Sequence, residues 1–198
     1  MKRIYSLLLI ASAMIVSCQD DDLMVDSFLF SRHNFILAGE TGSGIYSQDL
    51  FHDWEAYAYE IAGDSICLDI NRDFLKDVCV KYTTVSAANS YIAQTTVTCL
   101  NGAAISIDPK MANDSIYKFS SWSTSLAIME FTKIYFATND TSSSGAWISK
   151  VDKFLGVKIR TNGRITYGWI KMSSLVHPAT VYVQKICVKE FACQKAHS

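Results

Sequence analysis

Four oxygen-bearing side chains between residues 69 and 77 have the spacing of a metal-binding loop. Positions 1, 3, 5 and 9 of a calcium-type loop are occupied by Asp69, Asn71, Asp73 and Asp77. Alternate oxygen donors at this spacing can converge on one hard cation. However, Phe74 stands at position 6, where the sharp turn requires glycine, and position 12 is not acidic. The segment therefore predicts a strand-connecting loop that binds calcium weakly if it binds it at all, and we expect no other cofactor.

One dense set of titratable side chains, His52, Asp53 and Glu55, is a candidate for acid–base chemistry. On a strand, His52 would point to one face while Asp53 and Glu55 point to the other. No histidine pair has metal-ligand spacing, and no nucleophile motif has its required context. We therefore expect no hydrolytic activity. A glycan-processing enzyme stays open as an alternative, because two distant carboxylates can still meet in space.

Two aromatic residues could form a sugar-binding platform. Tyr167 and Trp169 alternate with Gly168, so both rings lie on one face of a strand. The missing side chain at Gly168 allows another backbone or ring to approach closely. Packing in the core is the favoured interpretation of the two rings, because Tyr and Trp bury large areas in sandwich interiors.

Strands must position all of these residues, because a period-2 pattern dominates the chain and no convincing amphipathic helix appears. The expected strands cover residues 56–61, 65–70, 78–82, 91–99, 103–107, 126–137, 154–160, 165–172 and 180–191.

Polar or glycine-containing turns are expected between these strands, among them Asp108-Pro109 and the Thr- and Ser-rich stretch 139–145. The strongest turn signal is Asn162-Gly163, which predicts a hairpin over residues 154–172 because both central residues of a type I′ turn need positive φ. Many short strands with regular turns indicate one all-β domain, a β-sandwich of jelly-roll type, over residues 28–198.

The hairpin around the 69–77 loop also predicts a cysteine contact. Asp69 and Asp77 pair symmetrically across this loop, and the same register places Cys67 opposite Cys79, within reach of a disulfide. Apart from Cys18, the chain has five cysteines, so at least one thiol stays unpaired. The redox state is open for Cys67, Cys79, Cys99, Cys187 and Cys193.

The charge of the chain argues against nucleic acid as a partner. The formal net charge is −1, and loss of Lys2 and Arg3 with a signal peptide would change it to −3. There is no basic run, whereas binding to phosphates requires clustered Lys and Arg.

The N-terminus resembles a bacterial lipoprotein signal peptide. Lys2-Arg3 precede an apolar stretch, and Ile15-Val16-Ser17-Cys18 resembles a lipobox. The apolar run is shorter than the roughly 20 residues that span a bilayer. The resemblance implies a signal peptide over residues 1–17 and a membrane anchor through lipid on Cys18. The acidic tether, residues 18–27, resembles the surface-export signal of Bacteroidota lipoproteins and implies an outer-membrane, cell-surface location.

Most of the chain after Cys18 resembles a group of secreted bacterial all-β proteins, most of which lack an assigned function. The resemblance rests on residues 154–159, on the YGWI stretch from Tyr167 to Ile170, and on residues 183–192. The segment 69–77 and the positions of Trp122 and Trp147 are also similar to this group. It implies the fold rather than a chemistry. We expect a non-catalytic binding or accessory protein with glycans or another surface protein as partner; the alternatives are a carbohydrate-binding module and a glycan-processing enzyme.

Overall fold

The computed structural model describes residues 35–57, 61, 63–117, 120–138, 140–176 and 182–195. All of the strands belong to one compact unit, Asn34–Ser198. The expected signal peptide, the tether and Cys18 lie outside the described residues. Within the described part of the chain, no helix is long and apolar enough to cross a membrane.

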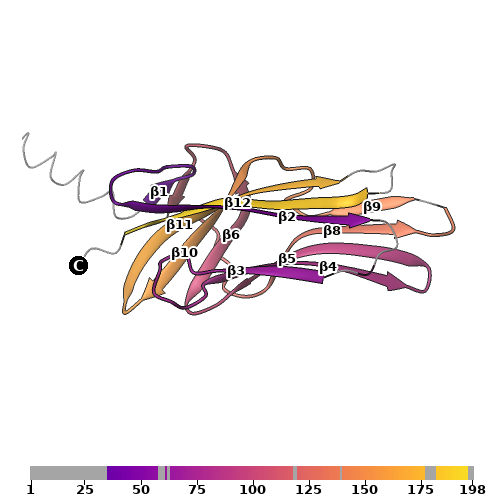
Figure 1. Ribbon diagram of the computed structural model, residues 1–198, viewed down its shortest axis with the longest axis horizontal. Coiled ribbons are helices and arrows are strands. Elements are labelled where there is room, and N and C mark those ends of the chain that lie inside the picture. The colour runs from indigo at the N-terminus through magenta and orange to yellow at the C-terminus, as the bar shows by residue number, and fades with distance from the viewer. Residues whose placement is uncertain are drawn as a thin grey trace, which may run out of the picture. The chain divides into compact units, whose positions relative to one another are not determined.

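Two five-stranded antiparallel sheets form the main body (Figure 1). The first sheet has the order β2-β12-β11-β10-β6, formed by Ile45–Tyr57, Tyr182–Gln194, Arg164–Val176, Lys153–Thr161 and Ala103–Lys110. The second sheet has the order β3-β4-β5-β8-β9, formed by Gly63–Leu68, Val78–Ala87, Ser90–Cys99, Ala127–Tyr135 and Thr141–Ser144. The β-sandwich expected from the sequence is therefore confirmed.

The main core lies between these two sheets. Inward-facing residues of the first sheet, such as Val157 and Ile170, pack in one cluster with Val80 and Val97 of the second sheet. Each residue is fully buried, and each follows the alternation that the period-2 pattern predicts. The alternation that the period-2 pattern predicts is therefore found on strands of both sheets.

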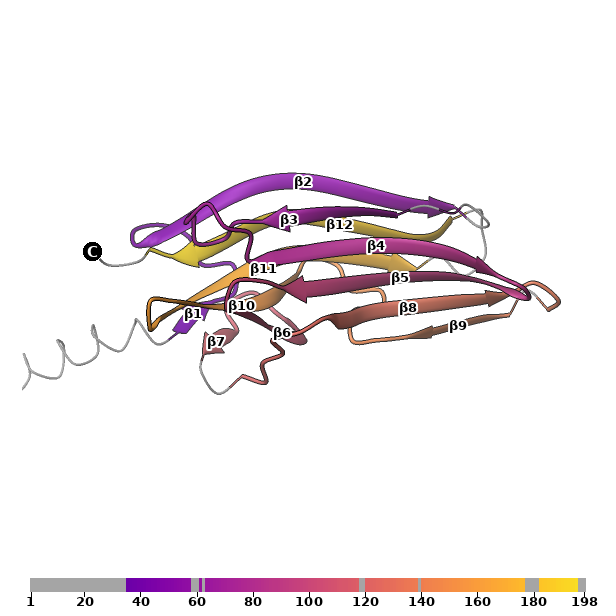
Figure 2. The ribbon, with the colours of Figure 1, turned by 90° about the horizontal axis from the view of Figure 1, so that it is seen from below.

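The other face of the first sheet is covered as well. A two-stranded sheet of β1 (Phe35–Leu37) and β7 (Ser115–Tyr117) packs on it (Figure 2). Ile36 and Ile116 of this small sheet form a second cluster with Tyr167 and Trp169 of β11. The sequence did not predict β1 or β7.

This second cluster rules out the aromatic platform. Tyr167 and Trp169 do share one face of β11, but their exposed fractions are 3% and 0%. A buried ring cannot stack on a sugar, so core packing is the correct interpretation. A Cβ atom on Gly168 would lie 2.5 Å from the carbonyl oxygen of Ala192. The expected close approach of another backbone at Gly168 is thus confirmed.

The predicted hairpin is confirmed. β10 and β11 pair from Lys153↔Met172 to Thr161↔Arg164. Asn162 and Gly163 at the turn have φ of 51° and 79°, as a type I′ turn requires.

Several strand boundaries differ from the sequence prediction. β2 begins at Ile45 rather than near residue 56, and the stretch 139–145, expected to be a turn, contains β9. Asp108-Pro109, also expected to be a turn, lies inside β6. Proline is tolerated there because β6 is an edge strand, where a missing N–H costs no ladder hydrogen bond.

The predicted contact between Cys67 and Cys79 is a disulfide. The two residues are directly opposite in the β3–β4 ladder, with a Cα–Cα distance of 4.0 Å. This short distance is typical of a non-hydrogen-bonded antiparallel pair. Cys99, Cys187 and Cys193 are free thiols.

We predict that replacing both partners, Cys67→Ala with Cys79→Ala, lowers the free energy of unfolding by about 3 kcal/mol, because the cross-link restricts the unfolded chain. Urea denaturation would measure this. A reductant should lower the midpoint of the wild type but not that of the double variant. Equal midpoints for wild type and double variant would contradict the prediction.

Candidate functional site

A groove of about 560 Å³ lies between β2 and β3, which are edge strands of different sheets. Its lining comes from β2, β3, the 69–77 loop and β12. The lining residues are Tyr46, Gln48, Leu50, Ile66, Cys67, Leu68, Asp69, Arg72, Phe74, Lys76 and Phe191.

The topology explains why the groove forms here. β2 and β3 are consecutive in the chain, yet each is the edge strand of a different sheet. Tyr46, Gln48 and Leu50 alternate along β2 and therefore point to one side. Farther along the same strands, the indole Nε1 of Trp54 donates a hydrogen bond to Asp64, at 2.8 Å. This hydrogen bond joins β2 to β3 near Trp54, and the groove lies between the opposite ends of the two strands.

The loop that bounds the groove is held by its own carboxylates. The two oxygens of Asp69 accept hydrogen bonds from the backbone N–H groups of Asp73 and Phe74, at 3.1 and 2.9 Å. Asp73 in turn accepts from the backbone N–H of Leu75, at 3.0 Å. The Asn71 amide donates to Asp73 and to Thr161 of β10, at 3.0 and 3.2 Å. These side chains therefore fix the loop and tie it to the first sheet.

Asp77 closes the base of the loop from inside. Its Oδ2 atom accepts hydrogen bonds from the backbone N–H groups of Ile70 and Asn71, at 2.7 and 3.3 Å. The residue is fully buried. Burial raises the pKa of Asp77 to about 6, against the two backbone hydrogen bonds, and the charges of Asp73 and Asp69 add to the rise.

The calcium interpretation of this loop gains no support from the geometry. Within the described residues, no group of three or more His, Cys, Asp or Glu side chains is arranged to hold a metal ion. Three of the four expected ligands, Asp69, Asp73 and Asp77, bind backbone N–H groups of the loop instead. Weak calcium binding stays a prediction.

Phe74 is the most unusual residue of the groove. Its φ is 69°, in the left-handed region that bulky residues avoid, and its side chain is 96% exposed. The position is the one where a calcium loop would carry glycine. The ring therefore adds no core contact that could offset its backbone strain, and strain of this kind concentrates at functional sites.

The same loop also presents a cation that stacks on the ring of Tyr46 on β2. The Arg72 guanidinium carbon lies 4.1 Å from the ring centroid of Tyr46, and Tyr46 meets Phe191 edge-to-face at 5.9 Å. The Tyr46 hydroxyl donates a hydrogen bond to Gln48 Oε1 at 2.6 Å. This bond does not use the two N–H donors of the Gln48 amide. The groove thus combines an exposed ring, a guanidinium and amide donors.

The set around His52 does not converge on one centre. His52 stacks edge-to-face on Trp54 at 4.5 Å and lies 3.6 Å from Asp64. Asp53 and Glu55 instead lie 3.7 and 2.7 Å from Lys185 on the other face. The predicted separation across the strand is confirmed.

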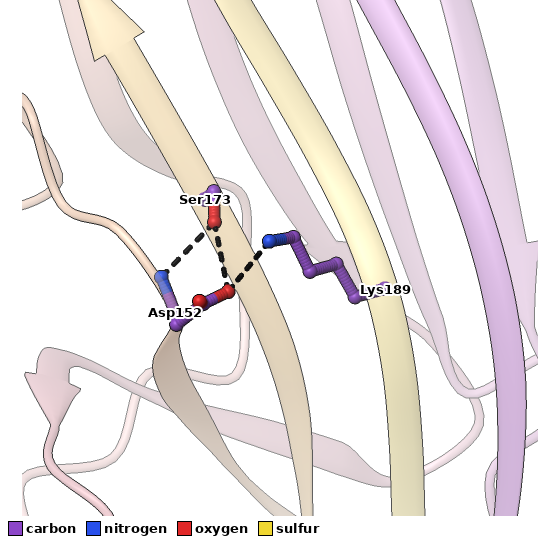
Figure 3. A network of polar contacts seen from close by, with 3 residues as sticks. All are labelled: Asp152, Ser173 and Lys189. Carbon is purple, nitrogen blue, oxygen red and sulfur yellow. Dashed lines mark hydrogen bonds and ion pairs between the residues drawn. The ribbon is translucent and has the colours of Figure 1, made fainter.

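A smaller hollow of about 190 Å³ lies over β11 and β12 and includes Cys187. Burial, followed by a hydrogen bond with Asp53, raises the pKa of the Cys187 thiol to about 12, so it is not an activated nucleophile. Beside the hollow, Asp152 binds Lys189 at 2.6 Å and Ser173 at 3.3 Å (Figure 3). This network joins the start of β10 to β11 and β12, which is a structural role.

A buried carboxyl also lies between the two sheets. The hydroxyl of Ser174 on β11 donates a hydrogen bond to Glu130 on β8, and Gln184 Nε2 of β12 donates to Thr95 of β5 at 3.4 Å. Burial raises the pKa of Glu130. The hydrogen bond from Ser174 to Glu130 thus connects the two sheets.

No protein-family model, curated protein or solved structure matches the chain. The site therefore rests on its geometry. Sequence reasoning identified the loop but not Tyr46 or Gln48 of β2, which meet it only in the folded chain, and it gave Arg72 of the loop no role. Phe74 carried a usable signal, because an aromatic residue stood where the loop pattern requires glycine.

We predict that Asp77→Asn makes the stability of the protein less dependent on pH. The folded pKa, about 6, is above the ordinary value of 3.8, so the unfolded state loses its proton first as pH rises. Wild-type stability should therefore fall between about pH 4 and pH 6, by about 1.4 kcal/mol for each pH unit between the two values. The variant should lack this loss because asparagine does not titrate in this range, and its amide oxygen can still accept the same two hydrogen bonds.

Urea denaturation at pH 4 and pH 7, with a chelator present, would measure the difference. Asp152→Asn is a control of opposite sign, because the hydrogen bond from Lys189 lowers the pKa of Asp152 and stabilises the folded state at neutral pH. The prediction fails if Asp77→Asn and wild type change in parallel with pH.

Proposed function

We propose that the protein is a lipid-anchored surface protein that binds a glycan, without cleaving it, in the groove between β2 and β3. The anchor is Cys18, as the lipobox resemblance implies, and the location is the outer membrane. This proposal joins the binding role expected from the sequence to the carbohydrate-binding alternative. The aromatic residue that contacts the sugar is Phe74, because Tyr167 and Trp169 are buried.

The observation that carries the proposal is Phe74. An exposed phenylalanine in the left-handed region costs about 1 kcal/mol or more and gains no packing within the chain. A ring held in this way at the border of a groove can cover the apolar face of a sugar. The amide of Gln48 and the guanidinium of Arg72 provide donors for hydroxyl groups nearby.

A non-catalytic role is favoured by the chemistry of the groove. Asp69 is the one carboxylate among the described residues that line the groove, and both oxygens of Asp69 already accept loop N–H groups. Glycoside hydrolysis normally uses two carboxyl groups on either side of the bond. The groove therefore provides contacts for binding rather than an acid and a base.

We predict that Phe74→Gly weakens glycan binding at least about tenfold while leaving the protein folded. The lost burial of a phenylalanine ring is large enough for this effect. Glycine tolerates the left-handed conformation, which offsets its greater freedom in the unfolded chain, so stability should change by less than about 1 kcal/mol. A glycan array of neutral and acidic oligosaccharides, followed by calorimetric titration of the strongest hit, would measure the affinity.

Phe51→Gly is the matched control. Phe51 is a second exposed phenylalanine with positive φ, at 73% exposure and 50°, but it does not line the groove. Its replacement should leave affinity unchanged. The proposal is wrong if the mature chain binds no glycan on the array, or if both variants bind as tightly as the wild type.

We predict that Cys18→Ala releases the protein from the membrane or leaves the precursor uncleaved. Stable anchoring needs more than one acyl chain, because a single chain holds only marginally. Membrane fractionation and mass spectrometry of the mature N-terminus would test this in the bacterial host. An unmodified mature Cys18 in the wild type would reject the anchor.

A further inference from the structure

We infer that the groove selects acidic saccharides, whose carboxylate is bound by Arg72 and Lys76. The inference rests on the proposed function, since it names the class of glycan that the same groove would take. It follows from the way charge is distributed over the 69–77 loop.

The acids of this loop are directed at its own backbone. Asp77 is buried, and Asp69 and Asp73 accept N–H hydrogen bonds from within the loop. Each carboxylate therefore has its charge balanced by amide dipoles rather than left for a ligand.

The bases of the loop have the opposite arrangement. Arg72 and Lys76 line the groove and are exposed, and neither forms an ion pair with any described residue. Contact with the Tyr46 ring restrains the Arg72 guanidinium at the wall of the groove. The groove therefore presents two cations, although the loop as a whole carries one more acid than base.

A carboxylate on a sugar ring matches this pair of cations. A guanidinium can bind both oxygens of a carboxylate through two parallel N–H donors, while an ammonium acts as a compact point charge. Phe74 would meet the apolar face of the same ring, so one acidic residue of a saccharide can satisfy both kinds of contact. A chain of glutamates could meet the cations, but its side chains have no flat apolar ring face for Phe74.

The test uses a matched pair of ligands, oligogalacturonate and its carboxyl-reduced counterpart, oligogalactose of the same length. Calorimetric titration of the mature chain should show binding of the acidic form that is tenfold to hundredfold tighter, the range expected for a charge-assisted hydrogen bond. Added salt should reduce this preference, because the cations are exposed.

Three variants separate the inference from general attraction between charges. Arg72→Gln should abolish most of the preference, and Arg72→Lys should restore only part of it because the planar fork is lost. Lys133→Gln is the control. It removes a cation that lies 4.7 Å from the Tyr135 ring, outside the groove, and should leave the preference intact.

The outcomes distinguish the inference from the proposed function. Equal affinity for both oligosaccharides, or a preference unchanged in Arg72→Gln, would overturn the acidic selectivity while leaving glycan binding in place. Failure to bind any oligosaccharide would overturn both. Binding of oligoglutamate as tight as that of oligogalacturonate would show that the groove recognises charge without a sugar and would also overturn the inference.

Discussion

The strands β10 and β11 are apolar on both faces, and the rest of the molecule is arranged around the need to cover both. Val157 and Ile170 face the second sheet, whereas Phe154 and Trp169 face the small sheet of β1 and β7. Each face would expose a large apolar area if left open, at about 25 cal/mol for each Å². Glycine makes the close packing possible, since a Cβ atom at position 156 would lie 3.1 Å from the Ile116 side chain.

The packing on both faces of β10 and β11 limits where a ligand can bind. Where β1 and β7 cover the first sheet, the accessible side chains of that sheet lie at its edges and in the adjoining loops. β2 is such an edge, β3 is an edge of the second sheet, and the 69–77 loop joins β3 to β4 beside them. The disulfide between Cys67 and Cys79 holds the base of that loop, so the groove combines a rigid frame with exposed polar side chains.

The loop itself shows how one pattern of residues can serve two purposes. Alternating oxygen donors suit a cation, but they suit the N–H groups of a tight turn equally well, and Asp69 and Asp77 bind such groups. The choice depends on whether the backbone turns toward the carboxylates, which a glycine at position 74 would influence. With Phe74 there, the turn is made at a cost in strain, and the ring is left in solvent.

The sequence by itself determined the features that depend on local pattern. Alternation predicted the two-layer sandwich, Asn162-Gly163 predicted its hairpin, and symmetry about the 69–77 loop predicted that Cys67 faces Cys79. The small sheet, the long β2 and the burial of Trp169 were decided by tertiary structure. β1 and β7 have three residues each and are 77 residues apart in the chain, so neither carries a period of its own. The groove is likewise tertiary, because Tyr46 of β2 and Arg72 of the 69–77 loop meet only after β2 and β3 have joined different sheets, and no local pattern encodes that contact.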